Sequence, residues 1–107
     1  MTTFALKYLE YDDVYQEVKN KYDVRSTEFQ ILRFIAKASL RESLPIKVRN
    51  LLDMSSIASP ATIHKAMKSL IAKGLLKVIS DKFDARIKYL APTPRAIRLF
   101  NELGELF

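Results

Sequence analysis

The residues best suited to chemistry in this sequence lie between positions 59 and 68, in the run SPATIHKAMK. Ser59-Pro60 is a strong helix start, because serine accepts hydrogen bonds from free backbone N–H groups and proline at the first helical position loses no donor. Apolar residues at helical spacing predict the buried stripe of this helix: Ile63, Ala66, Met67, Leu70 and Ile71. The side chains left on the opposite face are Ala61, Thr62, His64, Lys65 and Lys68.

These outward side chains suit binding better than catalysis. Thr62 and His64 carry groups that hydrogen-bond to base edges or phosphates, and the methyl group of Ala61 can contact a thymine methyl. Lys65 and Lys68 suit phosphates or guanine. The free N–H groups at the start of the helix also favour an anion. The pattern therefore predicts contact with double-stranded DNA, provided that the fold presents this helix outward.

The charge of the chain favours the same partner. The formal net charge is +6, from 18 lysines and arginines against 12 aspartates and glutamates. Residues 1–24 carry three basic and five acidic side chains, so the positive excess lies entirely in the rest of the chain. A positive body of this kind attracts polyanions, of which nucleic acid is the commonest, with an anionic membrane surface or an acidic protein as competitors.

Enzymatic and metal chemistry have little support. The chain has no cysteine and one histidine, which excludes a thiol nucleophile or thiolate zinc site and disfavours a histidine cluster. Only His64, Asp81 and Asp84 could be assembled for acid–base work, and no glycine-rich phosphate loop is present. We expect no enzyme, no cofactor and no bound metal. The N-terminus lacks the pattern of a signal peptide, and no run approaches the about 20 apolar residues of a membrane span, so the expected location is the cytoplasm.

The N-terminal segment carries an aromatic seam that must be covered. Spacings of three and four residues predict an amphipathic helix over residues 4–22. The seam consists of Phe4, Tyr8, Tyr11, Tyr15, Val18 and Tyr22. So much aromatic surface must pack on the body of the domain or on a second chain, and tyrosine, with one apolar and one wet side, favours an interface. We therefore treat residues 1–24 as an arm for dimerisation or packing.

The remaining elements follow from caps and from changes of period. Ser26-Thr27-Glu28 offers a capping hydroxyl and an early acid, Gly74 suits a left-handed helix end, and Thr93-Pro94 repeats the start signal of Ser59-Pro60. The predicted elements are a helix over 26–42, an extended stub at 44–46, a short helix over 47–54, a helix over 60–73, β-type runs at 75–79 and 87–90 joined by a charged tip, and a last helix from Pro94 to the C-terminus.

This order predicts a mostly α fold with a small β-hairpin (α+β). The short helix and the helix over 60–73 form a helix-turn-helix, and the hairpin forms a wing beside it. The second helix of such a pair is presented outward and fits the DNA major groove. Residues 25–107 are thus expected to form a winged-helix DNA-binding domain that includes the C-terminal helix.

Three stretches carry a resemblance to a known family. They are Ser59-Pro60-Ala61-Thr62-Ile63, the run LIAKGLL over 70–76, and Asp84-Ala85-Arg86. Through them the segment 26–93, roughly two thirds of the chain, resembles the winged helix of the MarR family of bacterial transcriptional regulators. The resemblance implies that Arg86 enters the DNA minor groove and that Asp84 supports the wing. A narrow minor groove concentrates negative potential, which agrees with this role for a guanidinium.

The same resemblance implies a two-fold dimer. Family members build it from N- and C-terminal helices, with small-molecule effector pockets beneath it, and are usually longer than this chain. The expected dimerisation residues are the seam together with Phe100, Leu103 and Phe107 of the last helix. A two-fold dimer would place two recognition helices about 34–36 Å apart, one helical turn of DNA.

Other readings stay open. A winged helix can bind protein instead of DNA, and a basic domain can bind DNA without sequence preference in an architectural role. Binding to an anionic membrane would require a basic amphipathic helix with a free apolar face, whereas the apolar stripe of the helix over 60–73 is committed to the core. The reading favoured is a sequence-specific, double-stranded DNA-binding transcriptional regulator that acts as a homodimer.

Overall fold

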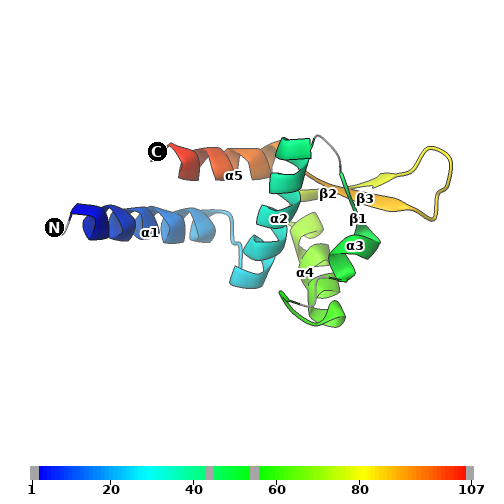
Figure 1. Ribbon diagram of the computed structural model, residues 1–107, viewed down its shortest axis with the longest axis horizontal. Coiled ribbons are helices and arrows are strands. Elements are labelled where there is room, and N and C mark those ends of the chain that lie inside the picture. The colour runs from blue at the N-terminus through cyan, green and yellow to red at the C-terminus, as the bar shows by residue number, and fades with distance from the viewer. Residues whose placement is uncertain (1–2, 43–44, 54–55, 106–107) are drawn as a thin grey trace.

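The computed structural model describes residues 3–42, 45–53 and 56–105. The elements along the chain are α1 (Thr3–Lys21), α2 (Ser26–Glu42), β1 (Ile46–Lys47), α3 (Val48–Leu52), α4 (Pro60–Ala72), β2 (Leu76–Ser80), β3 (Lys88–Pro92) and α5 (Pro94–Gly104). Figure 1 shows an elongated molecule with α1 and α5 side by side at one end and the β2–β3 hairpin at the other. Helix α2 stands between these ends, with α4 against it and α3 beside α4.

The predicted fold class is confirmed: the chain is mostly helical and carries a winged helix. The β part is larger than predicted, because the sheet has three antiparallel strands in the order β1-β3-β2. The stub expected at 44–46 overlaps strand β1 at Ile46, which pairs with Leu90 of β3. Helix α3 is shorter than the helix predicted over 47–54. Leu44 and Met54 lie outside the described residues.

Two helix starts were predicted correctly from their caps. Ser59 Oγ accepts a hydrogen bond from Thr62 N at 3.3 Å, and Thr93 Oγ1 accepts one from Ala96 N at 3.2 Å. Helix α2 differs from the prediction. Its cap is Glu28, whose Oε1 accepts from Arg25 N at 2.9 Å, while the Ser26 hydroxyl accepts from Lys19 Nζ. A glutamate at the third helical position that reaches back to the N-cap residue forms half of a capping box.

A single hydrophobic core joins all the helices to the sheet. Its largest fully buried side chains are Ile31, Leu32, Ile35, Leu51, Ile63, Leu70, Leu75, Leu90 and Leu99. The buried stripe predicted for α4 is confirmed by Ile63, Ala66, Met67 and Leu70, with Ile71 partly buried. Because this stripe packs into the core, the opposite face of α4 is held outward.

Helices α1 and α4 end in the same Schellman geometry. Val24 N donates to Lys19 O and Leu75 N donates to Leu70 O, so Asp23 and Gly74 each occupy the left-handed position, with φ of 56° and 73°. Glycine adopts this conformation without strain, whereas a residue with a Cβ pays for it.

Exchanging the residue types at these two caps should shift stability in opposite directions. Gly74→Ala is expected to lower the free energy of unfolding by about 1 kcal/mol, because the added Cβ meets nothing within 4 Å and only φ is strained. Asp23→Gly is expected to raise it by up to about 1 kcal/mol. Urea denaturation of both variants measures the two shifts. A loss of stability in Asp23→Gly would mean that the aspartate side chain matters more than its backbone strain.

Among the described residues, no helix is both long enough and apolar enough to cross a bilayer.

Candidate nucleic-acid interface

The outward face of α4 is built as the sequence predicts. Its N-cap Ser59, the first-turn residue Pro60 and the five side chains opposite the core stripe are all exposed. Those five are Ala61, Thr62, His64, Lys65 and Lys68. The Ser59 hydroxyl donates to Thr62 Oγ1 at 3.0 Å, which fixes both groups at the start of the helix. This face therefore offers a methyl, a hydroxyl, an imidazole and two ammonium groups on one rigid support.

The hairpin, with its connecting residues 81–87, forms a wing that carries a fixed arginine. Arg86 Nε donates to Asp84 Oδ1 at 3.0 Å and Arg86 Nη2 donates to Asp84 Oδ2 at 3.1 Å, and the backbone N–H of Arg86 also donates to Oδ1. These bonds hold the pKa of Asp84 below its ordinary value. The guanidinium still has donors that do not face Asp84. With its side chain 90% exposed, Arg86 is oriented and remains accessible to a ligand.

Asp81 organises the tip of the wing, a role that the sequence reasoning missed. Its Oδ2 accepts from the backbone N–H groups of Phe83 and Asp84, both at 3.0 Å, and its Oδ1 accepts from the Tyr89 hydroxyl at 3.1 Å. Hydrogen bonds from these three groups lower the pKa of Asp81. An aspartate that bonds backbone groups two and three residues ahead is a common turn signal, so the pattern at 81–84 could have shown this.

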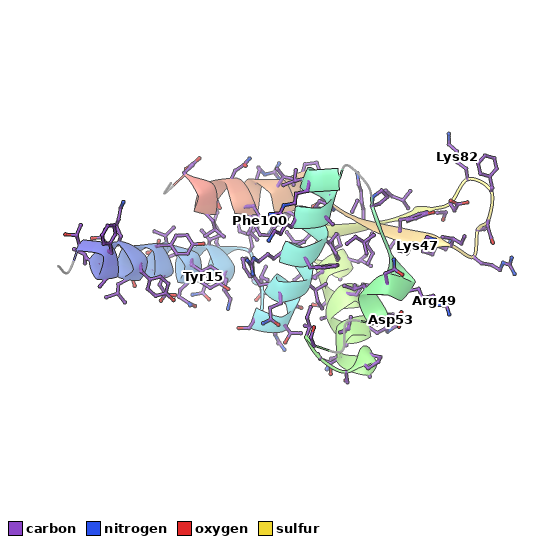
Figure 2. The ribbon with its side chains drawn as sticks, viewed as in Figure 1. Tyr15, Lys47, Arg49, Asp53, Lys82 and Phe100 are labelled. Atoms are coloured by element: carbon purple, nitrogen blue, oxygen red, sulfur yellow. The ribbon has the colours of Figure 1, made fainter. Side chains whose placement is uncertain are left out.

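A basic groove between α3 and the wing was also missed. Lys47, Arg49, Arg86 and Lys88 line it together with apolar side chains. Figure 2 shows Lys47 and Arg49 on the side of the molecule that faces the wing. The first helix of a helix-turn-helix crosses the DNA backbone, so a cation on α3 could have been predicted to reach a phosphate.

A second groove lies on the other side of α4, against the start of α2. Thr62 and Lys65 of α4 line it together with Arg25 and Thr27. Glu28 and Lys73 also line this groove and form an ion pair, with 2.7 Å between Lys73 Nζ and Glu28 Oε1. Cationic side chains thus lie beside the outward face of α4 at the start of α2, and others lie on α3 and the wing.

The residues considered for acid–base chemistry do not form a site. His64 lies on α4, whereas Asp81 and Asp84 lie in the wing with their carboxylates bonded to backbone N–H groups, Tyr89 and Arg86. Within the described ranges, no group of three or more histidine, aspartate or glutamate side chains is placed to hold a metal ion.

The aromatic seam divides into two parts. Val18 and Tyr22 are buried in the core of this chain, as is Leu103 of α5, so these three predicted dimerisation residues are not surface that a second chain could cover. Tyr15 also packs against this core. Its ring contacts that of Phe29 edge-on, with 5.0 Å between the ring centroids, and the centroids of Phe29 and Phe100 are 5.7 Å apart. Figure 2 shows Tyr15 and Phe100 at the junction of α1, α2 and α5.

The first half of α1 remains uncovered. Phe4 is 83% exposed and Tyr8 is 65% exposed, with Leu6 and Leu9 also open to solvent. Tyr11 is half-buried, and its ring stacks against that of Tyr15 with 6.4 Å between the ring centroids. Phe107, the last of the predicted dimerisation residues, lies outside the described residues.

Comparison with solved structures gives this geometry a context. No family model and no curated protein sequence matches the chain. The S. aureus MepR–DNA complex is similar in fold, with a TM-score of 0.74 and 15% identity, over 100% of this chain and 83% of MepR. The chain has the fold of the MarR-family regulators.

Two further structures agree with this fold. The transcriptional regulator Tm0710 from Thermotoga maritima has a TM-score of 0.70 and 18% identity, over 96% of this chain and 68% of its own. The zinc-responsive MarR family member ZitR from Lactococcus lactis has a TM-score of 0.57 and 23% identity, over 77% of this chain and 52% of ZitR. The resemblance to MarR proteins drawn from the sequence is therefore confirmed in three dimensions, at low sequence identity.

Proposed function

We propose that this chain is a sequence-specific, double-stranded DNA-binding transcriptional regulator of the MarR kind, with α4 in the major groove and the wing in the minor groove. The observation that carries the proposal is the outward face of α4, where five exposed side chains include two lysines, with further cationic side chains at the start of α2 and in the groove between α3 and the wing. An α-helix fits the major groove, and lysine, threonine and histidine side chains supply contacts to base edges and phosphates. A MarR-fold protein, MepR, has been crystallised with DNA.

We further propose that the chain acts as a homodimer through the first half of α1. Phe4, Leu6, Tyr8 and Leu9 are large apolar side chains exposed along this half. Aromatic and aliphatic groups gathered on one helix mark an interaction surface, and a two-fold dimer is the commonest assembly of soluble proteins. Tyr11 follows this surface along α1 and stacks on Tyr15, which contacts Phe29 and so connects the surface to the core.

A small-molecule effector is a further candidate partner. MepR has been crystallised with ethidium bromide, and that structure matches this chain with a TM-score of 0.71 and 17% identity. An effector of this chain would act by binding the DNA-competent and DNA-incompetent arrangements of the dimer with different affinity.

Two alanine substitutions test the assigned roles against each other. Arg86→Ala is expected to weaken binding by about tenfold, mainly on duplexes with A·T-rich flanks, because a narrow minor groove attracts a guanidinium. Lys68→Ala should weaken binding to all sequences about equally and reduce the salt slope by about 1, as expected for one lost phosphate contact. Fluorescence titration of duplexes that differ only in their flanks, at two salt concentrations, separates these outcomes. An equal loss for Arg86→Ala on every flank would refute the minor-groove assignment.

A further inference from the structure

The tip of the wing carries a large apolar side chain that the fold does not use. Phe83 is 96% exposed, more than any other large hydrophobic side chain in the described part of the chain. It lies between Lys82 and Asp84, within the segment that connects β2 to β3. Figure 2 shows Lys82 at the far tip of the wing, away from the helices. The phenyl ring therefore contributes nothing to the protomer core.

The backbone that presents this ring is held in place. Asp81 Oδ2 accepts the backbone N–H of Phe83 at 3.0 Å, and the Tyr89 hydroxyl fixes the same carboxylate from β3. Ile87 N donates to Asp84 O at 3.0 Å and closes the turn on the other side of the ring. The ring is thus carried on an ordered turn, which lowers the entropy that binding would cost.

The surroundings of the ring select the kind of partner. Lys82 precedes Phe83 in the chain and Arg86 and Lys88 follow it; all three side chains are exposed, and Asp84 is paired with Arg86. An exposed apolar group on a wing that also carries exposed cations matches a polyanion that has an apolar interior. Double-stranded DNA has this character, with phosphates outside and stacked bases within. A lipid surface would call for a broader apolar face than a single ring supplies.

We propose that Phe83 is an apolar wedge that enters the minor groove beside Arg86 and partly unstacks a base step. Minor-groove proteins insert phenylalanine, leucine or similar side chains between bases in this way and kink the duplex. Pyrimidine–purine steps such as TA unstack most easily, so the wedge favours them. This inference rests on the proposed function, because it assumes that the wing meets DNA.

The test uses the full chain and a duplex of alternating A and T, about three helical turns long, with 2-aminopurine in place of one adenine. Unstacking of this base raises its fluorescence. Wild-type protein is expected to raise the signal on binding, and Phe83→Ala to abolish the rise and weaken binding at least about fivefold. Phe83→Leu should retain most of the rise, since leucine also acts as a wedge. Leu40→Ala, at an exposed leucine of α2, is the matched control and should behave as wild type.

Phe83→Lys separates a wedge from a simple phosphate contact. A lysine at this position adds charge, so it should keep or raise affinity at low salt but should not raise the fluorescence. A rise that survives in Phe83→Ala and Phe83→Lys would overturn the wedge while leaving the proposed function intact. Failure of the wild-type protein to bind any duplex would overturn the proposed function itself. Binding of wild type, but not Phe83→Ala, to phosphatidylserine vesicles, with no effect on DNA, would assign the ring to a membrane and overturn the wedge.

Discussion

Reversing the charge of both Lys65 and Lys68 to glutamate is expected to lower the affinity for duplex DNA by at least about 100-fold at moderate salt. Both side chains are exposed on α4, in line with Thr62 and His64. Each lysine that meets a phosphate releases counterions, and each glutamate in its place would repel that phosphate. The dependence of log affinity on log salt should become shallower by about 2, one for each lost contact.

The control for this variant reverses the charge of two basic side chains on α2. Lys37 and Arg41 are exposed in the C-terminal half of α2, which Figure 1 shows away from the first turns of α4. Lys37→Glu with Arg41→Glu changes the net charge by the same amount, so it reports the effect of overall charge alone. Because α4 keeps its buried stripe in both variants, circular dichroism should show unchanged folding. Equal losses of affinity in the two double variants would remove α4 from the interface.

Replacing Glu28 by alanine is expected to lower the free energy of unfolding by about 2 kcal/mol. Glu28 is 4% exposed and binds two elements: Oε1 accepts from the backbone of Arg25 at the start of α2 and from Lys73 Nζ at the end of α4. Lys73 also donates to the backbone oxygen of Asp23. Removing the carboxylate leaves the capping N–H of Arg25 without its acceptor and removes the ion pair of Lys73, whose ammonium keeps the backbone oxygen of Asp23 as an acceptor. The ammonium can reach water in part, which keeps the loss below that of a fully buried pair.

The pH dependence of this effect has a definite sign. Burial raises the pKa of Glu28, but hydrogen bonds from Lys73, Ser69 and the Arg25 backbone outweigh it, and the net shift is downward. A carboxyl whose folded pKa is lowered contributes stability above its unfolded value, about 4.3, and loses that contribution as pH falls through the folded value. Glu28→Gln, which resembles the protonated acid, should therefore be less stable than wild type at pH 7, and the difference should narrow as the pH falls to about 3.

Denaturant unfolding at the two pH values measures this difference. Glu17→Gln removes one charge at an exposed position of α1 and should change stability by less than about 0.5 kcal/mol at either pH. A gap between wild type and Glu28→Gln that stays constant with pH would show that the ion pair with Lys73 contributes nothing to stability.

The sequence predicts those features of the fold that are encoded by residues close together in the chain. Ser59-Pro60, Gly74 and Thr93-Pro94 act within one helical turn, and all three mark element ends where predicted. The outward face of α4 followed from the same local period. The pairing of β1 with β3 and the bond between Glu28 and Lys73 join residues more than 40 positions apart, and no local pattern encodes them.

The aromatic seam shows the same limit. Its period correctly predicted a helix, but which half would be covered depends on where Phe29 and α5 lie in space. The side chains of Tyr15, Val18 and Tyr22 meet them, and those of Phe4 and Tyr8 do not. In the wing, the resemblance pointed to Arg86 and Asp84, whereas the role of Asp81 became visible only through its three hydrogen bonds.

Selection from a random pool of duplexes tests whether this chain binds DNA as a dimer that recognises a sequence. Purified protein is titrated with random-sequence duplex DNA at two salt concentrations, and the bound fraction is sequenced. The expected result is an enriched inverted repeat whose half-sites lie about 10 base pairs apart, because two recognition helices related by a two-fold axis would reach successive turns of the major groove. Salt-dependent binding with no enriched sequence would contradict it and indicate an architectural protein, and no binding at low salt would indicate a protein-binding winged helix.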